Sequence, residues 1–263
     1  MHLCGRRWRS GSRPFARAVT QLRAQLRQAR KELSELLFEQ QNLLLVVGPN
    51  LEARYVARLG GLELELLQQQ VENRRLLREI ELCQVAVNQR KTPPREDIEK
   101  QLDLELAQWK TQLRERGERI QASQLRLKKL LSPESSAAVR SLYRQLVKRL
   151  HPDLHPGQEE RERQLWFTVQ QAYQMSDWSR LETLLAVTDE EWVESSEELR
   201  RIQLRCEDRR DDLLKLRQQF PHHLGDKLQN EDWLRAQEGH LKLSILLERQ
   251  RHAKLRAVVQ EYW

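Results

Sequence analysis

Residues 22–47 read LRAQLRQARKELSELLFEQQNLLLVV, and apolar side chains return in this stretch by alternating steps of four and three residues. That spacing lines them along one side of a helix, with the period of a coiled-coil seam. The same alternation recurs over residues 59–87 and 102–130. The sequence therefore predicts three long helices whose seams pack against one another.

Proline-containing stretches separate these three helices. They are Gly48-Pro49-Asn50, Thr92-Pro93-Pro94 and Ser132-Pro133, and each combines residues that interrupt helical backbone. Helices of similar length joined by short turns fold back on one another. We therefore expect a three-helix antiparallel coiled coil over residues 16–131.

Five polar residues interrupt the apolar seams. They are Gln40, Gln69, Asn73, Arg116 and Ser123. Polar seam residues can fix the alignment of packed helices at some cost in stability. They are equally consistent with hydrated positions along the seam. Both interpretations, helix alignment and local hydration, stay open.

Helical patterning continues to the C-terminus. It covers residues 189–218 and 231–261, on either side of an interruption at residues 220–225, and predicts a C-terminal helical hairpin over residues 188–263. Charges alternate in sign in the first of these helices, among Glu191, Glu197, Glu198, Arg200, Arg201 and Arg205. Such alternation is typical of a solvated helix face. The predicted fold class is all-α.

Composition agrees with a helical fold. The chain has 263 residues, of which 32% are charged and 39% hydrophobic, and only nine are glycine. Leu, Glu, Arg and Gln are good helix formers, and scarce glycine argues against a β-sandwich, a barrel or a glycine-rich nucleotide fold. The longest apolar run, residues 42–47, is far shorter than the roughly 20 residues that a membrane crossing needs. Cys4, Cys83 and Cys206 form no disulfide framework. We expect a soluble, cytoplasmic protein.

The formal net charge of +7 is concentrated at the N-terminus. Residues 1–31 contain nine of the 46 basic residues and no acidic residue, whereas the other 232 residues carry 37 basic and 39 acidic side chains. No apolar stretch follows Arg6-Arg7, which argues against a secretory signal. We expect residues 1–15 to form a disordered basic arm. A transit peptide and weak contact with nucleic acid are the alternatives.

One segment carries a more specific pattern. Ser132 and Pro133 are suited to begin a helix, as N-cap and first helical residue, and this helix runs to Leu150. It ends at His151-Pro152-Asp153, because a proline disfavours helical geometry in the residue before it. A second helix begins near Glu159. We expect the two helices to pack antiparallel, with an exposed loop between them.

The first of these helices has a basic face and an apolar face. The basic residues are Arg140, Arg144 and Lys148, at intervals of four, with Arg149 beside them. The apolar residues are Val139, Leu142, Tyr143, Leu146, Val147 and Leu150, and the second helix adds Trp166, Val169, Ala172 and Tyr173. The apolar residues are expected to form the core of the pair and the basic ones its surface.

These two helices resemble the J-domain family. Residues 143–153, YRQLVKRLHPD, are similar to helix II and the HPD loop of that family, and Trp166-x-x-Val169-x-x-Ala172-Tyr173 is similar to its helix III. The resemblance covers about residues 132–178, and we expect a J-domain-like module over residues 132–187.

The resemblance implies a co-chaperone that docks on a DnaK-type chaperone and stimulates its ATP hydrolysis. In that case His151, Pro152 and Asp153 are the stimulating loop. The docking face comprises Arg140, Arg144, Lys148 and Arg149. The coiled-coil arms would then bind a client or another partner protein.

The segment also departs from the family pattern. Residues 125–131, the end of the third long helix, stand where a J-domain has its short first helix. Leu154 follows the HPD motif at a position that is usually basic, and the family's fourth helix, Gly/Phe-rich linker and zinc repeat are absent from the sequence. His151 could therefore simply end its helix. The module could also be a degenerate one within a coiled-coil scaffold protein that stimulates no chaperone.

Other chemistry has little support in the sequence. The histidines and Cys206 lack the paired spacing of a structural zinc site. No NTPase, hydrolase or metalloprotease motif occurs. We expect no enzyme activity, no metal and no cofactor. The expected partners are a DnaK-type chaperone and a client or scaffold protein; a homodimer stays open, and neither membranes nor nucleic acid are expected.

Overall fold

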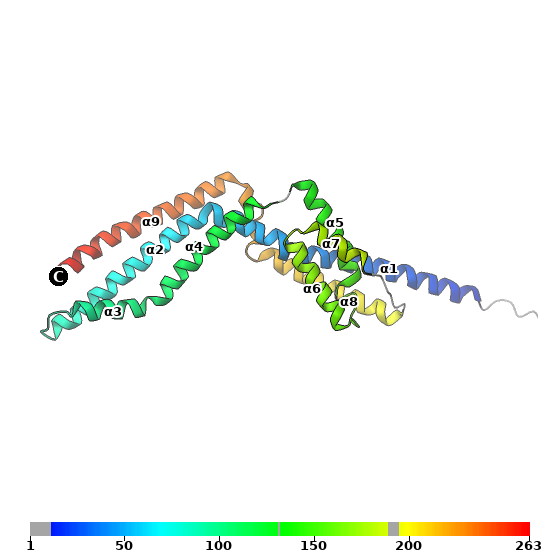
Figure 1. Ribbon diagram of the computed structural model, residues 1–263, viewed down its shortest axis with the longest axis horizontal. Coiled ribbons are helices and arrows are strands. Elements are labelled where there is room, and N and C mark those ends of the chain that lie inside the picture. The colour runs from blue at the N-terminus through cyan, green and yellow to red at the C-terminus, as the bar shows by residue number, and fades with distance from the viewer. Residues whose placement is uncertain (1–11, 131, 189–194) are drawn as a thin grey trace, which may run out of the picture. The chain divides into compact units, whose positions relative to one another are not determined.

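The computed structural model describes residues 12–130, 132–188 and 195–263, and over these residues it is helical and contains no strand (Figure 1). This confirms the predicted all-α class. The chain divides into a first unit, residues 1–48 and 131–222, and a second unit, residues 49–130 and 223–263. The first unit holds α1 (Ser12–Asn42), η1 (Leu43–Val47), α5 (Pro133–Leu150), α6 (Glu160–Gln174), α7 (Trp178–Ala186) and α8 (Ser196–Gln218). The second holds α3 (Arg95–Glu105), α4 (Ala107–Lys128), η3 (Lys227–Gln229), α9 (Glu231–Gln260) and nearly all of α2 (Gly48–Asn88), while η2 (His222–Leu224) begins at the boundary.

The first predicted helix break is wrong. Helical backbone continues through Gly48 and Pro49, because η1 is a π-helical turn that leads directly into α2. In a regular α-helix the Pro49 ring would clash with the carbonyl four residues earlier. A π-turn widens the backbone just before the proline, and the Gly48 N–H donates to the carbonyl of Leu43. Gly48 also leaves room for His222, whose Cε1 would lie 2.8 Å from an added Cβ.

The other two breaks are confirmed. Helix α2 ends at Asn88, ahead of the prolines at 93 and 94, and α3 begins at Arg95. Ser132 is the N-cap of α5, where its Oγ accepts a hydrogen bond of 3.2 Å from the Ser135 N–H. The third predicted helix is divided, since Leu106 separates α3 from α4.

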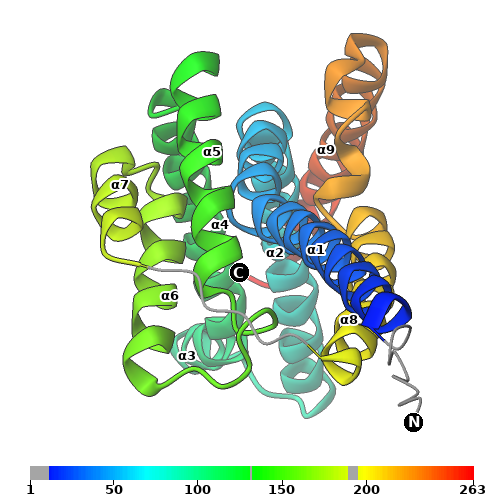
Figure 2. The same cartoon turned by 90° about the vertical axis from the view of Figure 1, so that its right-hand side faces the viewer.

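The seam of the first predicted helix is buried, but in the first unit and not in a three-helix coiled coil. Leu26 and Leu33 of α1 are almost completely buried in one core with side chains of α5, α6, α7 and α8. The most extensive packing of α1 is against α8, which lies alongside it in both views (Figures 1 and 2). The predicted coiled coil over residues 16–131 is therefore wrong, because α1 and α2 belong to different units.

In the second unit, polar contacts join α2 to α9 and to α4. The Asn73 amide donates to the Glu248 carbonyl at 2.9 Å and to its carboxylate at 2.6 Å. The indole N–H of Trp263, just beyond α9, donates to Glu79 at 3.0 Å. Arg119 of α4 pairs with a carboxylate of α2. Asn73 is 2% exposed, so at this seam position the polar residue aligns two helices.

The predicted C-terminal hairpin is wrong. Helix α8 packs along α1 in the first unit and α9 belongs to the second, so residues 188–263 form no module of their own. At the other terminus α1 begins at Ser12, within the predicted arm of residues 1–15, and residues 1–11 lie outside the described residues. None of the described helices combines the length and the apolar character that crossing a membrane requires.

The loop between α5 and α6 as a candidate functional site

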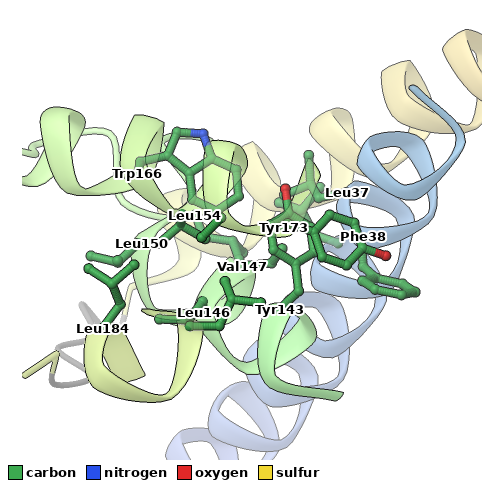
Figure 3. Packing of buried hydrophobic residues seen from close by; sticks show 14 of the residues in the cluster. Leu37, Phe38, Tyr143, Leu146, Val147, Leu150, Leu154, Trp166, Tyr173 and Leu184 are labelled. Atoms are coloured by element: carbon green, nitrogen blue, oxygen red, sulfur yellow. The ribbon is translucent and has the colours of Figure 1, made fainter. Parts of the chain in front are cut away.

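Aromatic rings from three helices pack at the centre of the first unit. The rings of Tyr143 and Tyr173 stack with centroids 3.7 Å apart and an angle of 7° between their planes. The ring centroid of Trp166 lies 5.9 Å from that of Tyr143. On the other side of Tyr143, the ring centroid of Phe38 of α1 lies 6.3 Å away (Figure 3). Stacked aromatic pairs add to the stabilisation by buried area. Helices α5 and α6 are therefore held together through side chains that the apolar pattern predicts.

The predicted module of residues 132–187 is more than a helical pair. Helix α7, which the sequence analysis did not predict, packs on both α5 and α6 and buries Leu181 and Leu184. The core also extends to α1 and α8. Residues 125–130 do not provide the first helix of this module, since they belong to the second unit and it is α1 that packs on α5. Residue 131 lies outside the described residues.

His151 ends α5 and is buried, contrary to the expected exposed loop. It adopts an extended conformation (φ −70°, ψ 129°), as a residue before proline prefers, while its N–H still donates to Val147. Its side chain is only 8% exposed, and its ring meets Trp166 edge-on with centroids 4.9 Å apart. The histidine is therefore a packing residue as well as the end of a helix.

The surroundings of His151 favour the neutral imidazole. Burial lowers its pKa to about 4, the Asp153 carboxylate opposes this shift, and the cations Arg209 and Arg205 add to it, as does His155. The Asp153 backbone N–H donates to Nδ1 of the ring at 3.1 Å. Because Nδ1 accepts this bond, the proton of the neutral ring is on Nε2. The hydrogen bond also fixes how the ring is turned.

The Asp153 carboxylate is held by arginines of α8. Arg205 pairs with one carboxylate oxygen, and Nε of Arg209 lies 3.1 Å from the other. The Asp153 carbonyl accepts a hydrogen bond of 3.1 Å from Arg201. These contacts leave the Asp153 side chain 14% exposed. The acidic side chain of the His151-Pro152-Asp153 motif is thus paired within the protein.

The rest of the loop is also fixed in place. Leu154, at the position where the family is usually basic, is 3% exposed and belongs to the core near Leu150 (Figure 3). His155 Nε2 donates to the Lys148 carbonyl at 2.9 Å, and the Gln158 amide donates to the Leu150 carbonyl at 2.8 Å. Both bonds satisfy carbonyls in the last turn of α5 that have no partner within the helix. Leu154 therefore anchors the loop where a basic side chain could not.

The four predicted docking residues differ in their surroundings. Arg140 and Lys148 are exposed on α5. Arg144 is half-exposed, lies over the Phe38 ring at 4.2 Å, and forms an ion pair with Glu35 at 3.1 Å. Arg149 donates to the carbonyls of Leu185 and Thr188, at 2.8 and 2.6 Å. All four residues belong to α5, but the guanidinium of Arg149 caps the C-terminal end of α7.

Sequence reasoning missed the arginines that contact Asp153. The alternating charges of α8 predict a solvated face, which is wrong for Arg201 and Arg205, since both contact the loop. The signal that could have found them is their spacing: Arg201, Arg205 and Arg209 follow at intervals of four and share one face of α8.

No group of three or more potential metal-ligating side chains occurs in the part of the chain that the structure describes. Comparisons with protein-family models, with curated proteins and with solved structures found no match. The arrangement of residues 132–188 and 195–218 is therefore the basis for any functional conclusion.

Proposed function

We propose that this protein is a J-domain-type co-chaperone that docks on a DnaK-type chaperone through α5 and stimulates its ATP hydrolysis through His151, Pro152 and Asp153. The observation that carries the proposal is the position of this motif. It joins an amphipathic basic helix to a helix that packs on it through Tyr143 and Tyr173. Arg140 and Lys148 are exposed on the same helix that leads into the loop.

A second candidate function is that of a helical scaffold in which the loop serves only packing. The burial of His151 and the ion pairs of Asp153 favour this alternative, because both side chains have structural roles inside the unit. The two candidates differ in whether the loop acts on another protein.

A steady-state ATPase measurement with a DnaK-type chaperone separates the candidates. We expect the wild-type chain to accelerate ATP hydrolysis and His151→Gln to lose most of this effect. His155→Gln is the matched control, since it removes a neighbouring histidine of the same loop. Circular dichroism of both variants checks that the helices are retained. If His151→Gln stimulates as well as wild type, the scaffold function is the correct one.

A further inference from the structure

Helix α8 places three arginines beside the loop. Arg201, Arg205 and Arg209 form one row along α8, and we call them the arginine row. All three contact Asp153: Arg201 through the backbone carbonyl, and Arg205 and Arg209 through the carboxylate. A row at intervals of four on one helix face presents its side chains together. The two ion pairs to the carboxylate come from Arg205 and Arg209, while Arg201 is also paired with Glu198.

The side chain of Asp153 is more deeply buried than the side chains of the two arginines that pair with it. The side chains of Arg205 and Arg209 are 38% and 25% exposed, against 14% for Asp153. Arg205 donates a charge-assisted hydrogen bond to this carboxylate, and Arg209 adds an ion pair. Asp153 is therefore not free to contact another protein while the row is in place.

Apolar contacts hold α8 in the unit independently of the row. Ile202, Cys206 and Leu213 are buried, and Cys206 lies against the backbone of α1. Arg210 and Arg217 form ion pairs with glutamates of α1. Removing charge from the row therefore leaves most of the packing of α8 intact. A partly buried carboxylate that loses its cations is strongly disfavoured, so the loop is then expected to open toward water.

We propose that α8 is an autoinhibitory element: the arginine row occupies Asp153 and holds the loop closed until the row is displaced. This inference rests on the proposed function, since it regulates the same loop. A chaperone can use Asp153 only in the fraction of molecules whose loop is open.

The test uses the full-length chain with Arg205→Gln and Arg209→Gln combined. The matched control combines Arg200→Gln and Lys215→Gln, which remove the same charge from exposed positions of α8. Hydrogen exchange is measured at the amides of Asp153, Leu154 and His155, which donate within the loop. ATP hydrolysis by a DnaK-type chaperone is measured in parallel. We expect exchange at least ten-fold faster, and stimulation several-fold higher, in the row variant than in the control.

The two measurements separate the possible failures. Unchanged exchange in the row variant overturns the inference, whatever the ATPase result. Faster exchange with the stimulation of wild type also overturns it, because the loop then opens without effect. If exchange is faster but wild type, row variant and control all fail to stimulate, the proposed function is wrong, although the row does close the loop. Arg205→Gln alone, which removes the more exposed arginine, is used if the double variant does not fold.

Discussion

At the residue scale, the burial of His151 makes the folded protein sensitive to acid. The pKa of this histidine is about 4 in the folded chain, against an ordinary value of 6.5. Below pH 6.5 the unfolded chain binds a proton here and the folded chain does not, so stability falls until the pH reaches about 4. Between pH 7.5 and 5 the free energy of unfolding should fall by about 2 kcal/mol. Chemical denaturation at the two pH values checks this expectation.

The control for this prediction is His151→Gln. The variant has no titrating group at position 151, whereas His222, whose pKa burial also lowers, is present in both proteins. The difference in free energy of unfolding between the variant and wild type should therefore change with pH. A constant difference from pH 7.5 to 5 would show that His151 is protonated equally in the folded and unfolded states.

The stacked tyrosines offer a matched pair of substitutions. The Tyr173 hydroxyl donates to the Asn42 side chain at 2.7 Å, whereas the buried Tyr143 hydroxyl has no hydrogen-bond partner among the described residues. Burial raises the pKa of both, that of Tyr173 to about 12. Tyr173→Phe should lower the free energy of unfolding by about 1 kcal/mol, and Tyr143→Phe should leave it unchanged or raise it. If chemical denaturation shows the same loss of unfolding free energy for both variants, the two hydroxyl groups do not differ in hydrogen bonding as described.

At the scale of the elements, Trp166 joins α6 to α5 and to the loop. Its side chain is 7% exposed and contacts the rings of Tyr143 and His151. Trp166→Ala removes a large buried ring and should destabilise the first unit by about 3–5 kcal/mol. Trp178→Ala is the control, since that tryptophan is 46% exposed. In thermal denaturation, the midpoint temperature should fall clearly for Trp166→Ala only. An equal fall for both variants would mean that Trp166 is not a core residue.

Local patterns predicted α5 and α6 well. Ser132 and Pro133 mark the start of α5, and alternating apolar steps mark the sides that are buried. Helix α7 was missed because it is only nine residues long, which gives too few turns for a periodic pattern. The continuous helix at Gly48-Pro49 was missed because a π-turn compensates for the proline and has no simple sequence signal. A short helix such as α7, and a helix that continues through a proline, therefore depend on tertiary packing that the local sequence pattern does not predict.

The loop itself was found from its sequence, but its contacts were not. Arg205 lies 52 residues from Asp153 along the chain, and only the folding of α8 onto α1 brings the two together. The burial of His151 likewise depends on Trp166 from the next helix. A motif indicates which residues belong to a site. Whether those residues are accessible is decided by distant elements.

At the scale of the whole molecule, the first seam predicts which side of α1 is buried and not which helices cover it. Leu26 and Leu33 are buried as the seam predicts, yet they are covered by α5 to α8. An apolar stripe stabilises packing against any complementary stripe, because the hydrophobic effect has no direction. The division into units therefore required the structure, whereas the helical class did not.

The last prediction concerns docking and rests on the proposed function. Arg140 and Lys148 are exposed on α5. Arg144 is half-exposed beside Glu35, and Arg149 caps α7. Reversing Arg140 and Lys148 to Glu should weaken chaperone binding at least ten-fold, because charge complementarity accelerates association and suppresses wrong orientations. Binding of wild type should weaken as salt rises, since screening acts over about 8 Å at physiological ionic strength.

The control for net charge reverses Arg54 and Lys100, which are exposed in the second unit. The basic N-terminus could imitate the salt dependence, so all proteins are compared without residues 1–11. Deleting all of residues 1–31 would remove Leu26 and Ala29 from the core of the first unit. Binding is measured by titration at low and high salt. If both reversals weaken binding equally, the effect is one of total charge, and α5 does not dock through Arg140 and Lys148. If neither does, the basic stripe is a solvated face and the scaffold function gains support.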